Sequence, residues 1–181
     1  MTFPNIVDLI STTVAQCRAT GADAPYYYFG HPLEIVNTLM EKDSSDVWKL
    51  KKYPAIFLFH DFEETRNKFE SEAELRIIIV TDTRPEWKAA DRYTNVFVPT
   101  LIPLYERFIY ELGRTTGISF GGEHRVKLYP YWGSESTGAN VANDYADAIE
   151  IKNCKIKTYS DCGFSAETFT TFDYTFDFLL Q

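Results

Sequence analysis

Two apolar segments joined by a short polar connection constrain the fold more than any other part of this sequence. Residues 53–62 (YPAIFLFHDF) are largely apolar on both faces of an extended chain until His60 and Asp61, and residues 72–80 (EAELRIIIV) are rich in isoleucine. Both compositions are typical of β-strands. Residues 67–70 suit a hairpin connection, so we expect the two strands to pair antiparallel. Both apolar runs are far too short to span a bilayer.

Three further strands are expected in the body of the chain. Residues 26–29 (YYYF) can form a short one. Residues 125–132 form another, and Pro130 near its end indicates a sheet edge or a bulge because proline donates no backbone hydrogen bond. Residues 147–158 form the third. The phase of its apolar residues shifts partway along, so we expect a bulge near Asn153.

Residues 168–180 (TFTTFDYTFDFLL) show the most regular alternation in the sequence, which predicts a strand with two different faces. The polar face offers only acids and hydroxyls: Thr171, Asp173, Thr175 and Asp177. The other face is apolar and aromatic: Phe172, Tyr174, Phe176, Phe178 and Leu180. From Tyr159 to the end of the chain there are four acids and no lysine or arginine. We treat residues 159–181 as a C-terminal strand extension.

Helical periodicity appears in two segments before the first long strand. Apolar residues recur every three or four positions in residues 4–18, which predicts an amphipathic helix. A second helix is expected from Pro32 to about Lys42.

A longer helix is expected after the two central strands. Thr83 and Glu86 fit a capping box that opens it. Pro99 and Pro103 each remove a backbone donor, so we expect a kink or a break there, and Gly113 is a natural stop. The predicted fold is one α+β domain with a mostly antiparallel sheet. The N-terminal helix and the long kinked helix pack on one of its faces.

Composition limits the classes of function. The chain of 181 residues suits one domain, and its net charge of −8 with a pI of about 4.9 argues against general affinity for nucleic-acid phosphates. Cys17, Cys154 and Cys162 form no paired framework, which indicates free thiols in a reducing compartment. The N-terminus resembles no signal peptide, so we expect a soluble product in the cytoplasm.

The long polar segment of residues 133–147 could bind a phosphate, a substrate or a neighbouring protein. It lacks the glycine patterns of nucleotide loops and any cation, and Glu135, Asp144 and Asp147 would oppose a phosphate. Loops of this length are usually functional or disordered, so a mobile insertion is the alternative to a contact loop. We interpret it as a contact loop. The residues we expect to form contacts, here and in the C-terminal strand, are Tyr131, Trp132, Asn140, Asn143, Asp144, Tyr145, Phe172, Tyr174 and Phe176.

Catalytic chemistry finds little support in the sequence. A nucleophile built from Cys154, His124 and Asp144 has no local motif behind it. The cluster HDFEE at residues 60–64 is best interpreted as a strand end that enters a charged turn. We expect no enzyme activity and no metal or cofactor.

Two other classes of function are alternatives to a protein without enzyme activity. A metal-dependent nuclease would use Asp61, Glu72 and Glu74, although the lysine usual for such a site is missing. A small-molecule binding module would use the plentiful aromatic side chains.

Two groups of lysines are the main basic clusters of the sequence. Lys42, Lys49, Lys51 and Lys52 form the first, and Lys152, Lys155 and Lys157 form the second. Solvated surface is the simplest interpretation of both. The alternative is electrostatic contact with an acidic neighbour, such as the C-terminal strand of another copy.

Four segments together resemble a family of small tail-region proteins of tailed bacteriophages and prophages. They are residues 26–43 (YYYFGHPLEIVNTLMEKD), 51–62 (KKYPAIFLFHDF), 92–108 (RYTNVFVPTLIPLYERF) and 128–151, where LYPYWG and NDYADAIEI carry the similarity. The order of elements also resembles tail terminator and neck proteins.

The resemblance implies a structural protein of the virion. It implies a ring, commonly a homohexamer, that ends the tail tube and joins it to the neck or connector proteins on the head side. Partners would then be other copies of the chain, the tail tube protein, neck proteins and, in a contractile tail, the sheath. DNA would pass through an acidic lumen without specific binding, and no membrane is involved. The protein would assemble in the host cytoplasm. A neck or stopper protein of the head–tail connector is the alternative.

Overall fold

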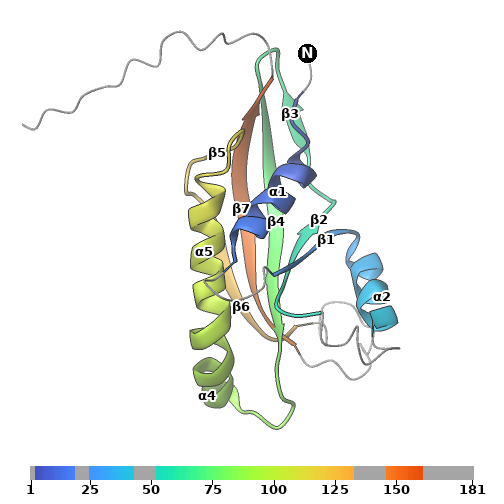
Figure 1. Cartoon of the computed structure of the whole chain (residues 1–181), viewed down its shortest axis with the longest axis vertical. Helices are drawn as coiled ribbons and strands as arrows, with labels where there is room; N and C mark the ends of the chain where they lie inside the picture. The colour runs from blue at the N-terminus through green and yellow to red at the C-terminus, as the bar shows by residue number, and fades with distance from the viewer. Residues whose placement is uncertain (1–2, 19–24, 43–51, 133–145, 161–181) are drawn as a thin grey trace, which may run out of the picture.

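The computed structural model describes residues 3–18, 25–42, 52–132 and 146–160, which form one sheet with helices packed against it (Figure 1). The elements in chain order are α1 (Ile6–Gln16), β1 (Tyr26–Gly30), α2 (Pro32–Lys42), β2 (Ala55–Phe59), β3 (Glu64–Arg66), β4 (Glu70–Asp82), α4 (Ala89–Arg92), the π-helical segment η1 (Tyr93–Leu101), α5 (Ile102–Leu112), β5 (Ser119–Phe120), β6 (Arg125–Trp132) and β7 (Ala146–Tyr159). The α+β fold predicted from the sequence is confirmed. The C-terminal strand expected at residues 168–180 lies outside the described residues.

The sheet has the strand order β1-β2-β4-β7-β5, with β3 beside β4 and β6 beside β7. The β1–β2 pair is parallel and every other described pair is antiparallel. The antiparallel pairing of β2 with β4 is as expected, and α2 connects the parallel pair. The long strands β4 and β7 run the length of the sheet and form its centre (Figure 1).

One face of the sheet carries the larger core. α1, η1 and α5 pack there, as Figure 1 shows for α1 and α5. Their buried residues Ile10, Leu101 and Phe108 join Ile77 of β4 and Ile151 of β7 in one cluster. Burial of side chains this large is the main stabilisation of the fold, at about 1.5–3 kcal/mol for each. The placement of the N-terminal and long helices on one face is therefore confirmed.

The long helix begins later than the sequence indicated. Thr83 and Glu86 precede it in a turn, so the predicted capping box is wrong. The helix begins at Ala89, where the carboxylate of Asp91 accepts a hydrogen bond from the backbone N–H of Lys88 at 3.1 Å. Only the half of a capping box that the acid supplies is present, five residues further along the chain.

The helix stays continuous past its first proline by changing type. Pro99 lies inside η1, where the backbone N–H of Ile102 bonds to the carbonyl of Phe97, five residues earlier. A π-helical segment accommodates the missing donor of a proline without ending the helix. The expected disturbance is present in this form. Gly113 caps α5, as expected.

The opposite face of the sheet has two different halves. Ile35 and Leu39 of α2 pack on Phe57, Phe59 and Ile78 and make a second apolar cluster. The sequence did not indicate which face α2 would cover. Toward the other end, the same face of β4 and β7 is charged.

A bulge in β7 sets which of its side chains reach each face. Leu75 pairs with Cys154 and Ile77 pairs with Ile151, so one residue of β4 lies opposite two of β7. Asn153 adopts a φ of 54°, a left-handed conformation that asparagine tolerates better than most residues. The bulge predicted near Asn153 is confirmed.

Candidate functional site

The predicted contact residues lie at the edge of what the structure describes. Tyr131 and Trp132 are the last two residues of β6, and the backbone of Trp132 pairs with Ala146 of β7. The remaining predicted contacts lie outside the described residues: Asn140, Asn143, Asp144, Tyr145, Phe172, Tyr174 and Phe176. The structure does show the two strands that enter and leave the loop, β6 and β7.

β6 is an edge strand with exposed apolar side chains. Among the described strands it pairs only with β7, and it lies at the margin of the sheet (Figure 1). Val126 and Leu128 are each 45% exposed. The edge position agrees with the expectation from Pro130, where the register with β7 also shifts. An open strand edge offers a row of backbone donors and acceptors to another strand.

The two faces of β6 differ in chemistry. Val126 and Leu128 pair with residues of β7 that belong to the larger core, so they point to the face that the helices cover. Arg125, Lys127 and Tyr129 alternate with them and point to the opposite face. The strand therefore has an apolar side and a basic side.

A buried carboxylate lies beside the basic side of β6. Glu150 of β7 has a fully buried side chain and accepts a hydrogen bond from Nε of Arg76 at 2.6 Å, with Nζ of Lys152 at 3.3 Å. Burial alone would raise the pKa of Glu150, but hydrogen bonds from Arg76, Tyr129 and Lys152 together lower it. Glu150 is consequently held as an anion among cations that β4 and β7 supply.

The lysines of β7 differ in how far the chain neutralises them. Lys157 lies 3.3 Å from Glu72 and 3.7 Å from Glu70 of β4. The hydrogen bond to Glu72 is the largest cause of its raised pKa. Lys152 is paired with Glu150, and Lys155 is exposed on the same face. Two of the three lysines in this predicted basic cluster thus form ion pairs inside the chain.

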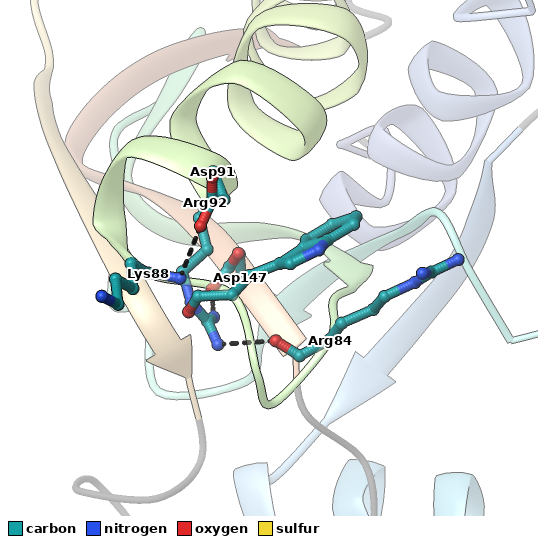
Figure 2. A network of polar contacts seen from close by, with 6 residues as sticks. Arg84, Lys88, Asp91, Arg92 and Asp147 are labelled. Carbon is teal, nitrogen blue, oxygen red and sulfur yellow. Dashed lines mark hydrogen bonds and ion pairs between the residues drawn. The ribbon is translucent and has the colours of Figure 1, made fainter.

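A second ion pair, buried on both sides, fixes the start of β7 (Figure 2). Arg92, only 1% exposed, donates to Oδ1 of Asp147 at 2.5 Å. It also donates to the carbonyls of Trp87 and Arg84, each at 3.0 Å. One guanidinium therefore joins the beginning of the long helix, the connection before it and the second residue of β7.

The pairing with Arg92 changes the expected electrostatic role of Asp147. The sequence counts Asp147 among the acids that would repel a phosphate and finds no cation between residues 133 and 147. The structure brings Arg92 to Asp147 from 55 residues away. Asp147 therefore anchors the strand and adds no uncompensated charge to the loop.

The proposed nuclease residues are all described. Glu72 is paired with Lys157, and Glu74 accepts a hydrogen bond from Asn153. Among the described residues, no three His, Cys, Asp or Glu side chains form a group that could hold a metal ion. That finding includes Asp61, which follows the end of β2.

The residues proposed for a cysteine nucleophile have other environments. Cys154 is fully buried, and burial raises its pKa to about 12, so the thiolate is disfavoured at neutral pH. Nε2 of His124 and the hydroxyl of Tyr105 form a hydrogen bond of 2.7 Å. Asp144 lies outside the described residues.

The HDFEE cluster is a strand end, as the sequence indicated. β2 ends at Phe59, and His60 begins a bend. The ring of His60 lies 5.5 Å from the ring of His31, between centroids.

In the other lysine cluster, Lys42 lies over the rings of Tyr26 and Tyr28.

No protein-family model matches the chain, and neither does any curated protein sequence. In the part of the chain that the structure describes, no helix has both the length and the apolar character needed to cross a membrane.

The residues that sequence reasoning missed are the two ion pairs that hold the buried carboxylates of Asp147 and Glu150. Arg92 and Asp147 are 55 positions apart, and Arg76 and Glu150 are 74 positions apart. No local pattern connects residues so distant in the sequence. The available signal was the presence of two acids, Asp147 and Glu150, in the otherwise apolar strand segment ADAIEI.

Proposed function

We propose that this chain is a structural subunit of the tail of a tailed phage or prophage, a tail terminator or tail-completion protein that assembles into a ring. The observation that carries the proposal is the edge of β6, which no described strand other than β7 covers. Its apolar side exposes Val126 and Leu128 at 45% each, and its other side presents Arg125 and Lys127. The resemblance of residues 26–152 to tail-region proteins gives the direction of the inference.

The edge suits assembly for a physical reason. An added strand satisfies the outer backbone groups of β6 by main-chain hydrogen bonds, and the alternating side chains select its sequence. The basic side chains Arg125 and Lys127 favour an acidic partner and disfavour a basic one. A contact between two different surfaces of identical copies closes into a ring when the rotation between copies allows it.

The charge of the chain supports a passage for DNA. A net charge of −8 gives the assembled copies a negative surface, which repels phosphates at distances up to about a Debye length. A neck or stopper protein on the head side would use the same physical features. The position of the protein in the particle separates these two roles.

The first experiment measures mass in solution and locates the protein in purified particles. Light scattering after gel filtration is expected to give a multimer, and labelling in particles is expected at the head-proximal end of the tail. A strict monomer that is absent from virions contradicts the proposal.

A matched pair of variants tests the part played by the edge. Leu128→Asp places a charge on the apolar side of β6 and is expected to shift the mass toward the monomer. Tyr110→Asp is the control, because Tyr110 is similarly exposed, at 53%, but lies on α5 and not on β6. It is expected to leave the mass unchanged. An equal effect of the two substitutions would remove the edge from the assembly contact.

A further inference from the structure

We propose that β6 of one copy pairs antiparallel with residues 168–180 of a second copy. This inference rests on the proposed function, because it names the contact that joins neighbouring subunits. It follows from three features: the two faces of β6, the distribution of charge along the chain, and the distance between the end of β7 and β6.

The chemistry of β6 specifies its partner. A strand added beside β6 must place apolar side chains next to Val126 and Leu128, and acidic or neutral ones next to Arg125 and Lys127. The sequence of residues 168–180 carries both sets in strict alternation. Its apolar set is Phe172, Tyr174, Phe176, Phe178 and Leu180, and its polar set contains Asp173 and Asp177.

Pairing of β6 with β6 of a second copy is disfavoured by charge. A two-fold contact of this kind would put Arg125 and Lys127 of both copies on the same face of one continuous sheet. Like charges on neighbouring strands destabilise the pair. The edge therefore favours a different, acidic segment as its partner.

The C-terminal segment carries the charge that the edge requires. Four of the 26 acids and none of the 18 lysines and arginines lie in residues 159–181. This segment therefore has a net charge of −4, half of the −8 of the whole chain. The exposed guanidinium of Arg125 and the exposed amine of Lys155 lie on the face that such a segment would approach.

Chain length limits how residues 168–180 can reach β6 of the same copy, and the ring proposal requires a contact between copies. The described chain ends at Ser160, whose backbone N–H bonds to the carbonyl of Phe69 at the far end of β7. A strand antiparallel to β6 begins opposite Tyr129, which pairs with Ala148, eleven positions before Tyr159. At 3.3 Å per residue, Ala148 and Tyr159 are about 36 Å apart along β7.

Only part of the segment can cover this distance within one copy. Residue 168 lies eight positions after Ser160, and eight extended residues span at most about 29 Å. Antiparallel pairing with β6 of the same chain is therefore out of reach for registers that place residues 168–169 beside Tyr129, whereas registers that begin at about residue 170 or later are within reach, and interchain capture distinguishes them from pairing in trans. Parallel pairing within one copy needs less length but gives a less stable ladder, and it is an outcome that the following experiment detects.

Disulfide capture in the full-length chain tests the contact. Leu128→Cys is combined in turn with Tyr174→Cys, Phe176→Cys and Phe178→Cys in a Cys162→Ser background. Neighbouring strands lie about 4.8 Å apart, within the range that a disulfide bridges. Mild oxidation is expected to give covalent dimers and higher multimers for at least one combination. The control replaces Leu128→Cys by Tyr110→Cys and is expected to give none.

A charge exchange gives a second measurement that does not depend on register. Arg125 pairs with Lys152 across the sheet, so Arg125→Glu adds no repulsion inside the subunit. Arg125→Glu alone, or Asp173→Lys with Asp177→Lys, is expected to weaken assembly about three- to tenfold, as reversed surface charges do. The chain that carries all three substitutions is expected to regain assembly.

The outcomes separate this inference from the proposed function. A multimer with normal mass, no interchain disulfides and no response to the charge exchange overturns the inference and leaves the ring proposal standing. Disulfides confined within one chain overturn the pairing in trans. A strict monomer absent from particles overturns both proposals.

Discussion

Replacement of Arg92 by alanine is expected to be among the most destabilising single changes in this chain. The side chain of Arg92 is 2% exposed and that of Asp147 is 0% exposed, with 2.5 Å between Nη1 and Oδ1. Arg92→Ala leaves a carboxylate buried without its cation, which typically costs about 3–5 kcal/mol. It also removes the donors to the carbonyls of Trp87 and Arg84. Because all three bonds come from one guanidinium, their individual energies are not added.

That cost is large compared with the whole stability of a domain. Native domains are stable by about 5–15 kcal/mol, so the variant would lose between about a fifth and all of that margin. For a chain of this size, 3–5 kcal/mol corresponds to a fall in Tm of roughly 6–20 °C. Urea unfolding followed by circular dichroism measures the free energy of unfolding directly.

Arg107→Ala is the matched control. Arg107 lies on the same long helix and forms an ion pair with Glu111 at 2.6 Å, with side chains that are 49% and 10% exposed respectively. Because solvent reaches the Arg107 side of this pair, the variant is expected to cost clearly less than Arg92→Ala, although the carboxylate of Glu111 loses its cation. The double variant Arg92→Leu/Asp147→Leu is expected to recover part of the loss, because it leaves no lone charge buried. Equal losses for Arg92→Ala and Arg107→Ala would refute the reasoning.

Three further predictions concern the core, pH and thiol chemistry. Phe108→Ala removes a fully buried ring from α5 and is expected to lower the free energy of unfolding in urea by about 3–5 kcal/mol. Tyr110 lies two positions further along the same helix and is 53% exposed, so Tyr110→Ala is expected to cost less than about 1 kcal/mol. The pKa of Glu150 is lower in the folded state than in the unfolded state, where it is about 4.3. The ion pairs of Glu150 therefore stabilise the protein fully above the unfolded pKa, and this stabilisation is lost as the pH falls through the folded pKa. Arg76→Gln is therefore expected to reduce the acid-dependent loss of stability, and an unchanged slope of stability against pH below about 5 would contradict this. Burial raises the pKa of Cys154 to about 12, so its thiol is expected to resist a disulfide reagent at pH 8 until guanidinium unfolds the chain. Mass spectrometry of the labelled peptide can follow this reaction.

Local patterns predicted the elements of this fold well. The limits of α2 and β6 and the bulge near Asn153 all follow from periodicity, proline position and a phase shift. The start of the long helix did not follow, because Thr83 and Glu86 match the capping pattern, whereas in the structure Asp91 accepts from the backbone of Lys88, which is not a usual N-cap residue. The two residues of β5 were missed, since so short a strand depends on β7 and has no pattern of its own.

The candidate site was harder to predict because it depends on contacts between distant parts of the chain. The sequence indicated that β6 is an edge, from Pro130, but not that Val126 and Leu128 stay exposed on the helix-covered face. It also gave no sign that Arg92 would neutralise Asp147. Such pairs are settled by how the long helix crosses the sheet, which is a property of packing and not of local sequence.

The bulge in β7 connects the core to the charged face beside β6. Before the bulge, Ile149 and Ile151 point into the larger core, and after it Ile156 does so. Side chains alternate along a strand, so a regular strand would instead turn Lys155 and Lys157 into that core. The extra residue at Asn153 therefore lets one strand continue the core and still present its lysines on the face that Glu150 and the basic side of β6 share. A change of register at this one position would remove both the core contact and the charge pattern that we propose a neighbouring copy recognises.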